Sequence, residues 1–250
     1  MHMKKPILLT LLLCSILQAQ AATPENTTTS AVTVLRQAYD AGLATYPEVL
    51  QEEISALEAE FFACTDTKKQ SKLFEVITQR YMEAGRLAEA REKNGFAPQG
   101  ESTRIRMAMY LFILSNPVET PDTKTVREAN ETAYTLCKLA ETSYASGLCS
   151  YDEVLYAQIQ SMLTGVNAYT RGLEYAHTEE LEQQGLKACQ QLRELAQKRY
   201  QQGLITEEQS TRIIALTLEA EYCVARTFQK DAKQAARLQA ELNKLQNKQP

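Results

Sequence analysis

The sequence contains no tryptophan, two histidines, nine glycines and seven prolines among 250 residues. His2 lies in an N-terminal leader, so only His177 remains, and any catalytic or metal site that needs two histidines is excluded. The HExxH, CxxCH, GxSxG, P-loop and GxGxxG motifs are also absent. We therefore expect no catalytic residues, no metal site and no cofactor, and we interpret the chain as a protein that is not an enzyme.

Basic clusters and long apolar runs are missing as well. The chain has 27 Lys and Arg against 31 Asp and Glu, and two of the lysines lie in the leader, which leaves a net charge of −6. Nucleic acids and anionic membranes are therefore poor candidates as partners. The longest later apolar run, residues 107–114, is too short for a membrane span and predicts a buried element. We expect no integral membrane span in the mature chain.

The first 21 residues have the composition of a secretory signal peptide. Lys4 and Lys5 form a positive start, residues 7–17 are largely apolar, and residues 19–21 are Ala-Gln-Ala, which suits cleavage. The signal predicts a periplasmic or secreted protein. A lipid anchor on Cys14 is not expected, because the residue before it is a large leucine.

The rest of the chain divides by composition. Residues 22–30 are polar and low in complexity, which predicts a flexible tether. Residues 31–250 are rich in good helix formers and form the predicted helical-hairpin domain. A sub-boundary is expected within residues 94–121, where Gly and Pro interrupt the pattern.

A phrase of about ten residues occurs three times in this domain. Each copy starts with Tyr, has Gly-Leu three residues later, and continues with Thr or Ser and then Glu or Gln. The copies are Tyr39, Gly42, Thr45 and Glu48; Tyr144, Gly147, Ser150 and Glu153; and Tyr200, Gly203, Thr206 and Gln209. A degenerate fourth copy is predicted at residues 81–85.

The order of residues in each copy predicts a helix end followed at once by a helix start. Gly can adopt the left-handed conformation that ends a helix, and the Leu after it can fold back onto the last turn. The Thr or Ser then caps the next helix, and the Glu or Gln completes a capping box. The Tyr can pack on the turn, with an aromatic platform for a sugar or peptide as the alternative. Each copy thus predicts an αα-hairpin.

Apolar residues on both sides of these turns alternate at spacings of three and four, which is typical of helical seams. Together with the capping signals they predict helices over residues 30–41, 46–63, 66–93, 102–115, 121–146, 151–175, 178–202 and 207–245. The predicted fold class is all-α, an antiparallel bundle or array of αα-hairpins with coiled-coil-like seams. Residues 232–245 could extend past the other helices and face a partner.

Five cysteines follow the leader: Cys64, Cys137, Cys149, Cys189 and Cys223. Because five is odd, at least one thiol is free or pairs with another chain. Cys189 and Cys223 flank the third turn at distances that differ by about one turn of helix, so a disulfide between them is compatible with an antiparallel hairpin.

The repeated phrase resembles a motif of outer-membrane efflux proteins of the TolC type. The form Y-x-x-G-L-x-[ST]-x-x-E-V-L is complete at residues 39–50 and 144–155, and the third copy loses Val-Leu. Members of that family form trimers with long periplasmic helical hairpins and export small molecules or proteins. The sequence shows no alternating strands, so the resemblance implies a related helical hairpin alone.

Several functions remain open. The leading hypothesis is a non-catalytic scaffold or binding protein that acts on another cell-envelope component through helical surfaces. An accessory of a TolC-like efflux or secretion system is the first alternative, and it predicts a trimer or docking through hairpin ends. A small-ligand carrier predicts an apolar pocket near residues 107–114. An enzyme would need a cluster of buried acids with shifted pKa values. The sequence leaves the oligomeric state open.

Overall fold

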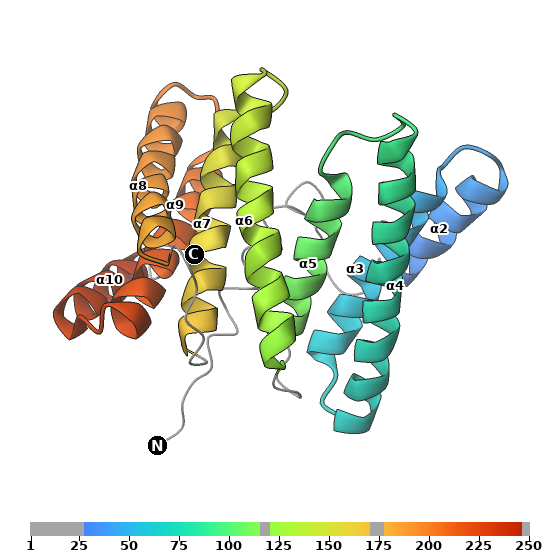
Figure 1. Ribbon diagram of the computed structural model, residues 1–250, viewed down its shortest axis with the longest axis horizontal. Coiled ribbons are helices and arrows are strands. Elements are labelled where there is room, and N and C mark those ends of the chain that lie inside the picture. The colour runs from blue at the N-terminus through green and yellow to red at the C-terminus, as the bar shows by residue number, and fades with distance from the viewer. Residues whose placement is uncertain (1–27, 116–120, 171–177, 247–250) are drawn as a thin grey trace. The chain divides into compact units, whose positions relative to one another are not determined.

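The computed structural model describes residues 28–115, 121–170 and 178–246 (Figure 1). These residues form helices and turns, without a strand among them, which confirms the all-α fold class. The helices are α2 (Thr28–Asp40), α3 (Tyr46–Ala63), α4 (Thr67–Lys93), α5 (Glu101–Ser115), α6 (Thr123–Ala145), α7 (Tyr151–Thr170), α8 (Thr178–Gln201), α9 (Glu207–Cys223) and α10 (Ala232–Gln246). None of the helices described has both the length and the hydrophobicity that crossing a membrane requires.

The N-terminal predictions fall largely outside the described residues. The predicted signal peptide, with Cys14, and residues 22–27 of the predicted tether lie there. Residues 28–30, the last part of that tether, are instead the first residues of α2. Residues 28 and 29 thus extend the helix that was predicted to start at residue 30.

The chain divides between Pro121 and Asp122 into two compact units. The N-terminal unit contains α2 to α5, and the C-terminal unit contains α6 to α10. The division falls at the end of the stretch 94–121, in which the sequence predicts a sub-boundary. Within each unit, every helix packs against the next helix along the chain.

The core of the N-terminal unit is aromatic. The ring of Phe112 on α5 lies 5.1 Å from that of Phe61 and 5.5 Å from that of Phe74. Besides Phe61 and Phe112, the buried residues of this core are Leu50, Ile54, Leu73, Ile77 and Tyr81. The apolar run at residues 107–114 thus supplies buried side chains from a helix.

The C-terminal unit packs in two ways. Where α6 meets α7, the buried residues are small: Cys137, Ala140, Val154 and Ala157. Where α7, α8 and α9 meet, they include Leu155, Ile159, Met162, Leu192 and Ala220. Helices α7 and α8 approach closely, because a Cβ placed on Gly185 would lie 2.4 Å from the Cβ of Met162.

The long C-terminal helix predicted over residues 207–245 is broken. Helix α9 ends at Cys223 and continues as a π-helical turn, Val224–Phe228. The chain then turns at Lys230, whose φ is 54°. Asp231 caps the next helix by accepting a hydrogen bond from the amide of Lys233 at 3.0 Å.

Helix α10 therefore folds back onto α9 (Figure 1). Its apolar stripe is buried in a cluster formed by Leu218, Ala225, Ala235, Leu238 and Leu242. The expectation that residues 232–245 extend past the other helices toward a partner is wrong, because this stripe is covered within the unit.

The two units share the same local arrangement of tyrosines. Each unit has a pair of tyrosine rings beside the turn that joins its first two helices. In the N-terminal unit the rings of Tyr39 and Tyr46 lie 5.8 Å apart at an interplanar angle of 48°. In the C-terminal unit the rings of Tyr144 and Tyr151 lie 5.3 Å apart at 44°. Each pair connects the end of one helix with the start of the next.

The second tyrosine of each pair also makes the same kind of hydrogen bond. The hydroxyl of Tyr46 on α3 donates to Glu83 on α4 at 2.5 Å, and the hydroxyl of Tyr151 on α7 donates to Gln191 on α8 at 3.0 Å. Helices α2 to α5 therefore correspond to α6 to α9, and their positions can be paired from these tyrosines.

A fourth turn of the repeated kind joins α4 to α5. The amide of Gly95 donates to the carbonyl of Glu92 at 3.0 Å, and the amide of Phe96 donates to that of Arg91 at 2.8 Å. Residues 81–85 lie inside α4, so the fourth copy predicted there is wrong. The sequence does contain a signal for this turn. It is Gly95 followed by a large apolar residue, which is Phe96 where the other copies have Leu.

Candidate functional site

The three predicted glycine turns all have the expected backbone. Gly42, Gly147 and Gly203 have φ angles of 73°, 71° and 70°. In the second turn, the amide of Gly147 donates to the carbonyl of Tyr144 at 2.9 Å, and the amide of Leu148 donates to that of Ser143 at 2.8 Å. The other two turns repeat this pair of bonds, which satisfies the last carbonyls of the helix.

The predicted capping residues start the next helices. The amide of Thr206 donates to the side chain of Gln209 at 2.9 Å, and the amide of Gln209 donates back to the Thr206 hydroxyl at 3.1 Å. Ser150 and Glu153 make the same exchange at 3.3 and 3.4 Å. Both turns therefore hold the reciprocal bonds of a capping box.

At the first turn, Glu48 supplies the acceptor. Its carboxylate accepts hydrogen bonds from the amide and the hydroxyl of Thr45, each at 2.7 Å. These bonds hold the pKa of Glu48 below its ordinary value. Helix α4 is capped by Asp66, whose carboxylate accepts hydrogen bonds from the amides of Lys68 and Lys69. Helix α6 is capped by Asp122, whose carboxylate accepts a hydrogen bond from the amide of Thr125.

Within each unit, two turns lie at the same end. In the C-terminal unit, Arg199 near the end of α8 pairs with Asp152 at the start of α7, with one bond of 3.0 Å. In the N-terminal unit, Arg91 near the end of α4 acts electrostatically on Glu48 at the start of α3. The α2–α3 turn therefore neighbours the α4–α5 turn, and the α6–α7 turn neighbours the α8–α9 turn.

The apolar residue after each turn glycine is exposed to solvent. The exposed fractions are 84% for Leu43, 75% for Phe96, 81% for Leu148 and 68% for Leu204. The expectation that this leucine folds back onto the helix is wrong, since its side chain stays in solvent and hydrogen bonds close each turn without it. We call these four side chains the apolar end residues. Tyr39, Tyr144 and Tyr200 are also exposed beside them.

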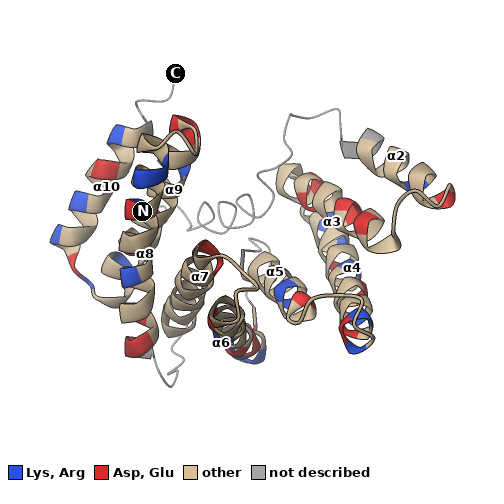
Figure 2. Ribbon diagram, turned by 90° about the horizontal axis from the view of Figure 1, so that it is seen from above, with Lys and Arg blue, Asp and Glu red and all other residues tan. Residues whose placement is uncertain are grey.

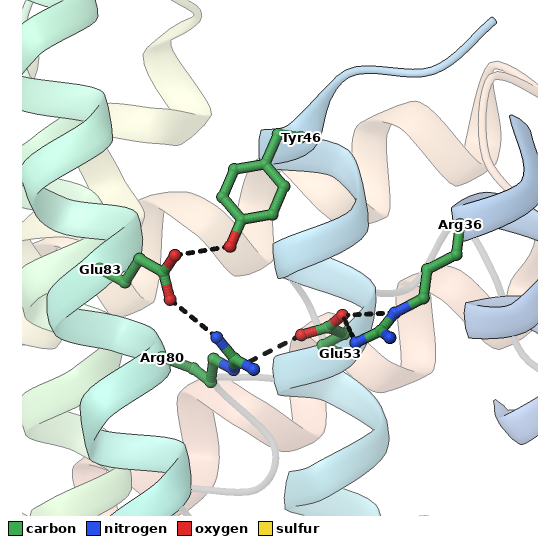
Figure 3. Close-up of polar contacts among 5 residues, drawn as sticks. All are labelled: Arg36, Tyr46, Glu53, Arg80 and Glu83. Atoms are coloured by element: carbon green, nitrogen blue, oxygen red, sulfur yellow. Dashed lines mark hydrogen bonds and ion pairs between the residues drawn. The ribbon is translucent and has the colours of Figure 1, made fainter. Parts of the chain in front are cut away.

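A charged network connects three helices of the N-terminal unit (Figure 3). Glu53 of α3 accepts a hydrogen bond from Arg36 of α2 at 2.9 Å and pairs with Arg80 of α4 at 3.5 Å. Arg80 also pairs with Glu83 at 2.9 Å. The hydrogen bond from Tyr46, and secondly that from Arg80, lower the pKa of Glu83, and the same Tyr46–Glu83 bond raises the pKa of Tyr46.

The C-terminal unit makes the corresponding contact with less charge. Gln158 follows Tyr151 by seven residues, as Glu53 follows Tyr46. Its side-chain amide donates to Glu141 of α6 at 3.3 Å. The charges of the network are therefore not needed to bring these helices together, and its geometry is that of a structural ion-pair network.

We expect Glu53→Gln to lower the stability of the N-terminal unit by only about 1 kcal/mol. Arg36 and Arg80 have side chains 59% and 36% exposed, so both can be hydrated when Glu53 loses its charge. Urea unfolding at low and high salt measures the effect, with Glu60→Gln, at an exposed pair with Lys69, as the control. A loss of more than about 3 kcal/mol would assign the network a larger role.

Two carboxyl groups of the described residues have raised pKa values, one in each unit. Burial raises the pKa of Glu58 in α3 and of Glu219 in α9. Oε2 of Glu219 is buried without a hydrogen-bond partner. Among the described residues no group of three His, Cys, Asp or Glu could hold a metal ion.

The five cysteines in the described residues are free thiols, so the structure does not contain the Cys189–Cys223 disulfide. Cys189 is fully buried in the α7–α8–α9 core, whereas α9 contributes Ala220 to that core and not Cys223. Burial raises the pKa of Cys137 to about 12 and that of Cys223 to about 11. Both thiols are therefore protonated and unreactive near neutral pH.

Comparison with known proteins adds no assignment. No protein-family model, curated protein or solved structure matches the chain. The resemblance of the turns to TolC-type proteins therefore remains a hypothesis based on the motif.

Proposed function

We propose that this protein is a non-catalytic, exported binding or scaffold protein that contacts another cell-envelope protein through its hairpin ends. The observation that carries the proposal is the exposure of the apolar end residues Leu43, Phe96, Leu148 and Leu204. Each unit presents two of them at one end. Large apolar side chains that recur at equivalent exposed positions are typical of a binding surface.

The charges around these residues favour an uncharged partner surface. Arg91 pairs with Glu101, and Arg199 pairs with Asp152, so these two bases near the helix ends are neutralised within their own units. Acidic and basic residues are interspersed along the helices (Figure 2). The partner that fits best is a protein with apolar pockets for leucine or phenylalanine side chains. An accessory of a TolC-like efflux or secretion system is the narrower form of this proposal.

We expect Leu148→Glu combined with Leu204→Glu to weaken partner binding by about tenfold or more, because a buried leucine is worth about 1.5–3 kcal/mol. Thermal stability should stay within about 0.5 kcal/mol of the native value, since both side chains are exposed. The partner is first identified with a photo-cross-linking amino acid at position 43 or 148 in the expressing cell. Affinity for that purified partner is then measured by calorimetry.

The matched control for cross-linking is position 76, because Val76 is an exposed apolar residue within α4, away from the turns. A single partner that cross-links from positions 43 and 148 but not from 76 supports the proposal. Equal labelling from all three positions, or unchanged affinity of the double variant, refutes it.

A further inference from the structure

The core of the N-terminal unit encloses a carboxyl group. Glu58 lies on α3 and is only 8% exposed. It accepts a hydrogen bond from the hydroxyl of Tyr81 on α4 at 2.8 Å. The ring of Tyr81 lies 6.3 Å from that of Phe112, at the centre of the aromatic core. A group of this kind is stable in such surroundings when it is neutral and hydrogen-bonded.

Several charged groups on the surrounding helices pair with residues other than Glu58. On α2, Arg36 pairs with Glu53. On α3 and α4, Arg80 pairs with Glu53 and Glu83, and Lys69 pairs with Glu60. On α5, Glu101 pairs with Arg91 of α4, and Arg106 acts on Glu89. Burial raises the pKa of Glu58 and outweighs the hydrogen bond from Tyr81, which lowers it and is the only other described influence on this pKa.

The C-terminal unit builds the same helix pair without an acid. Leu163 follows Tyr151 by twelve residues, as Glu58 follows Tyr46. Cys189 precedes Gln191 by two residues, as Tyr81 precedes Glu83. Both Leu163 and Cys189 belong to the apolar cluster of α7, α8 and α9. The fold therefore does not require a carboxyl and a hydroxyl at these positions.

We propose that Glu58 and Tyr81 form a proton-operated latch between α3 and α4. With Glu58 protonated, the carboxyl group lies in the core and the two helices pack tightly. When Glu58 releases its proton to solvent, a carboxylate remains among aromatic rings with one hydroxyl as its partner. The α3–α4 contact then loosens, because hydration of the carboxylate requires the helices to separate.

The sign of the pH dependence follows from the raised pKa of Glu58. The stabilisation is complete below the ordinary carboxyl value of 4.5 and is lost as pH rises through the raised value in the folded state. Glu48, Glu83 and Glu89 change the stability with pH in the direction opposite to Glu58. Their pKa values are lowered, so their contribution is lost as pH falls below 4.5. Tyr46, Lys69 and Arg80 also have raised pKa values, but their ordinary values are 10.0 or higher. A loss of stability in this unit between about pH 5 and about pH 8 is therefore assigned to Glu58.

The test is hydrogen–deuterium exchange of the full chain, followed in peptides from α3 and α4 and corrected for the intrinsic effect of pH on exchange. We expect protection to fall about tenfold or more between about pH 5 and about pH 8. Glu58→Gln, which keeps the shape and cannot ionise, should remove most of this fall. Glu60→Gln, at an exposed position on the same helix, should leave it unchanged.

The double variant Glu58→Leu with Tyr81→Cys places the residue types of Leu163 and Cys189 in the N-terminal unit. Its protection should also not depend on pH. If that variant does not fold, Glu58→Gln alone decides the question. Protection that falls equally in the native chain and in Glu58→Gln overturns the proposal, as does protection that does not change with pH in the native chain.

Discussion

Phe112→Ala should unfold the N-terminal unit at a much lower temperature and leave the C-terminal unit intact. Phe112 is 1% exposed, and its ring contacts those of Phe61, Phe62, Phe74 and Tyr81. Truncating a buried phenylalanine costs about 3–5 kcal/mol, through lost transfer energy and the cavity left behind. For a unit of this size, such a loss lowers the unfolding midpoint by roughly 15 °C or more.

The measurement is hydrogen–deuterium exchange during a thermal series, with peptides assigned to each unit. Peptides from α3 to α5 should lose protection early, whereas those from α7 to α9 should keep it, because the core of α7 to α9 is formed by residues of the C-terminal unit. Phe96→Ala is the matched control, since Phe96 is 75% exposed and its loss should change stability by less than about 0.5 kcal/mol. Loss of protection in both units at one temperature would contradict the expectation.

Gly185→Ala should destabilise the C-terminal unit, although alanine favours helix more than glycine does. The added Cβ would lie 2.4 Å from Cβ, 2.5 Å from Sδ and 2.8 Å from Cγ of Met162, which is 1% exposed. Because the Cβ of Met162 is fixed by its backbone, rotating the methionine side chain cannot relieve the contact, and α7 must move away from α8. Overpacking costs about 1–3 kcal/mol, which exceeds the gain of up to about 1 kcal/mol in helix propensity.

Gly165→Ala in α7 is the control that separates the effect of steric packing from the effect of helix propensity. A Cβ at Gly165 meets no atom within 4 Å, so this substitution should stabilise the unit by about 0.5–1 kcal/mol. Urea unfolding of both variants therefore gives changes of opposite sign. Equal changes would mean that α7 and α8 are not in close contact at Gly185.

Turn glycines and capping residues predict the helix bounds well, because each acts on the backbone within a few residues. The glycine of each repeated turn needs a positive φ, and in the second and third turns the Ser or Thr that follows accepts a hydrogen bond from an amide three residues later. These constraints are contained in the turn itself, so helix α3 begins at Tyr46 and ends at Ala63 as predicted. For the same reason the sequence identified the residues of the three turns without any knowledge of the packing.

The break between α9 and α10 was missed for the opposite reason. The apolar stripe through residues 224–245 keeps helical spacing across the break, and only Asp231 interrupts it. Periodicity shows that a segment has one apolar face but not which element covers that face. The chain reverses at Lys230 because α9 itself offers the surface that α10 covers.

The sequence by itself determined the helical class, the turns and most helix bounds, since these follow from backbone preferences and hydrogen bonds within a few residues. The tertiary structure alone decided which turn residues are exposed and which acids are buried. Glu58 and Glu60 are neighbours on one helix, yet the first lies in the core and the second pairs with Lys69 in solvent. Burial depends on the helices that pack nearby, and those helices come from distant parts of the chain.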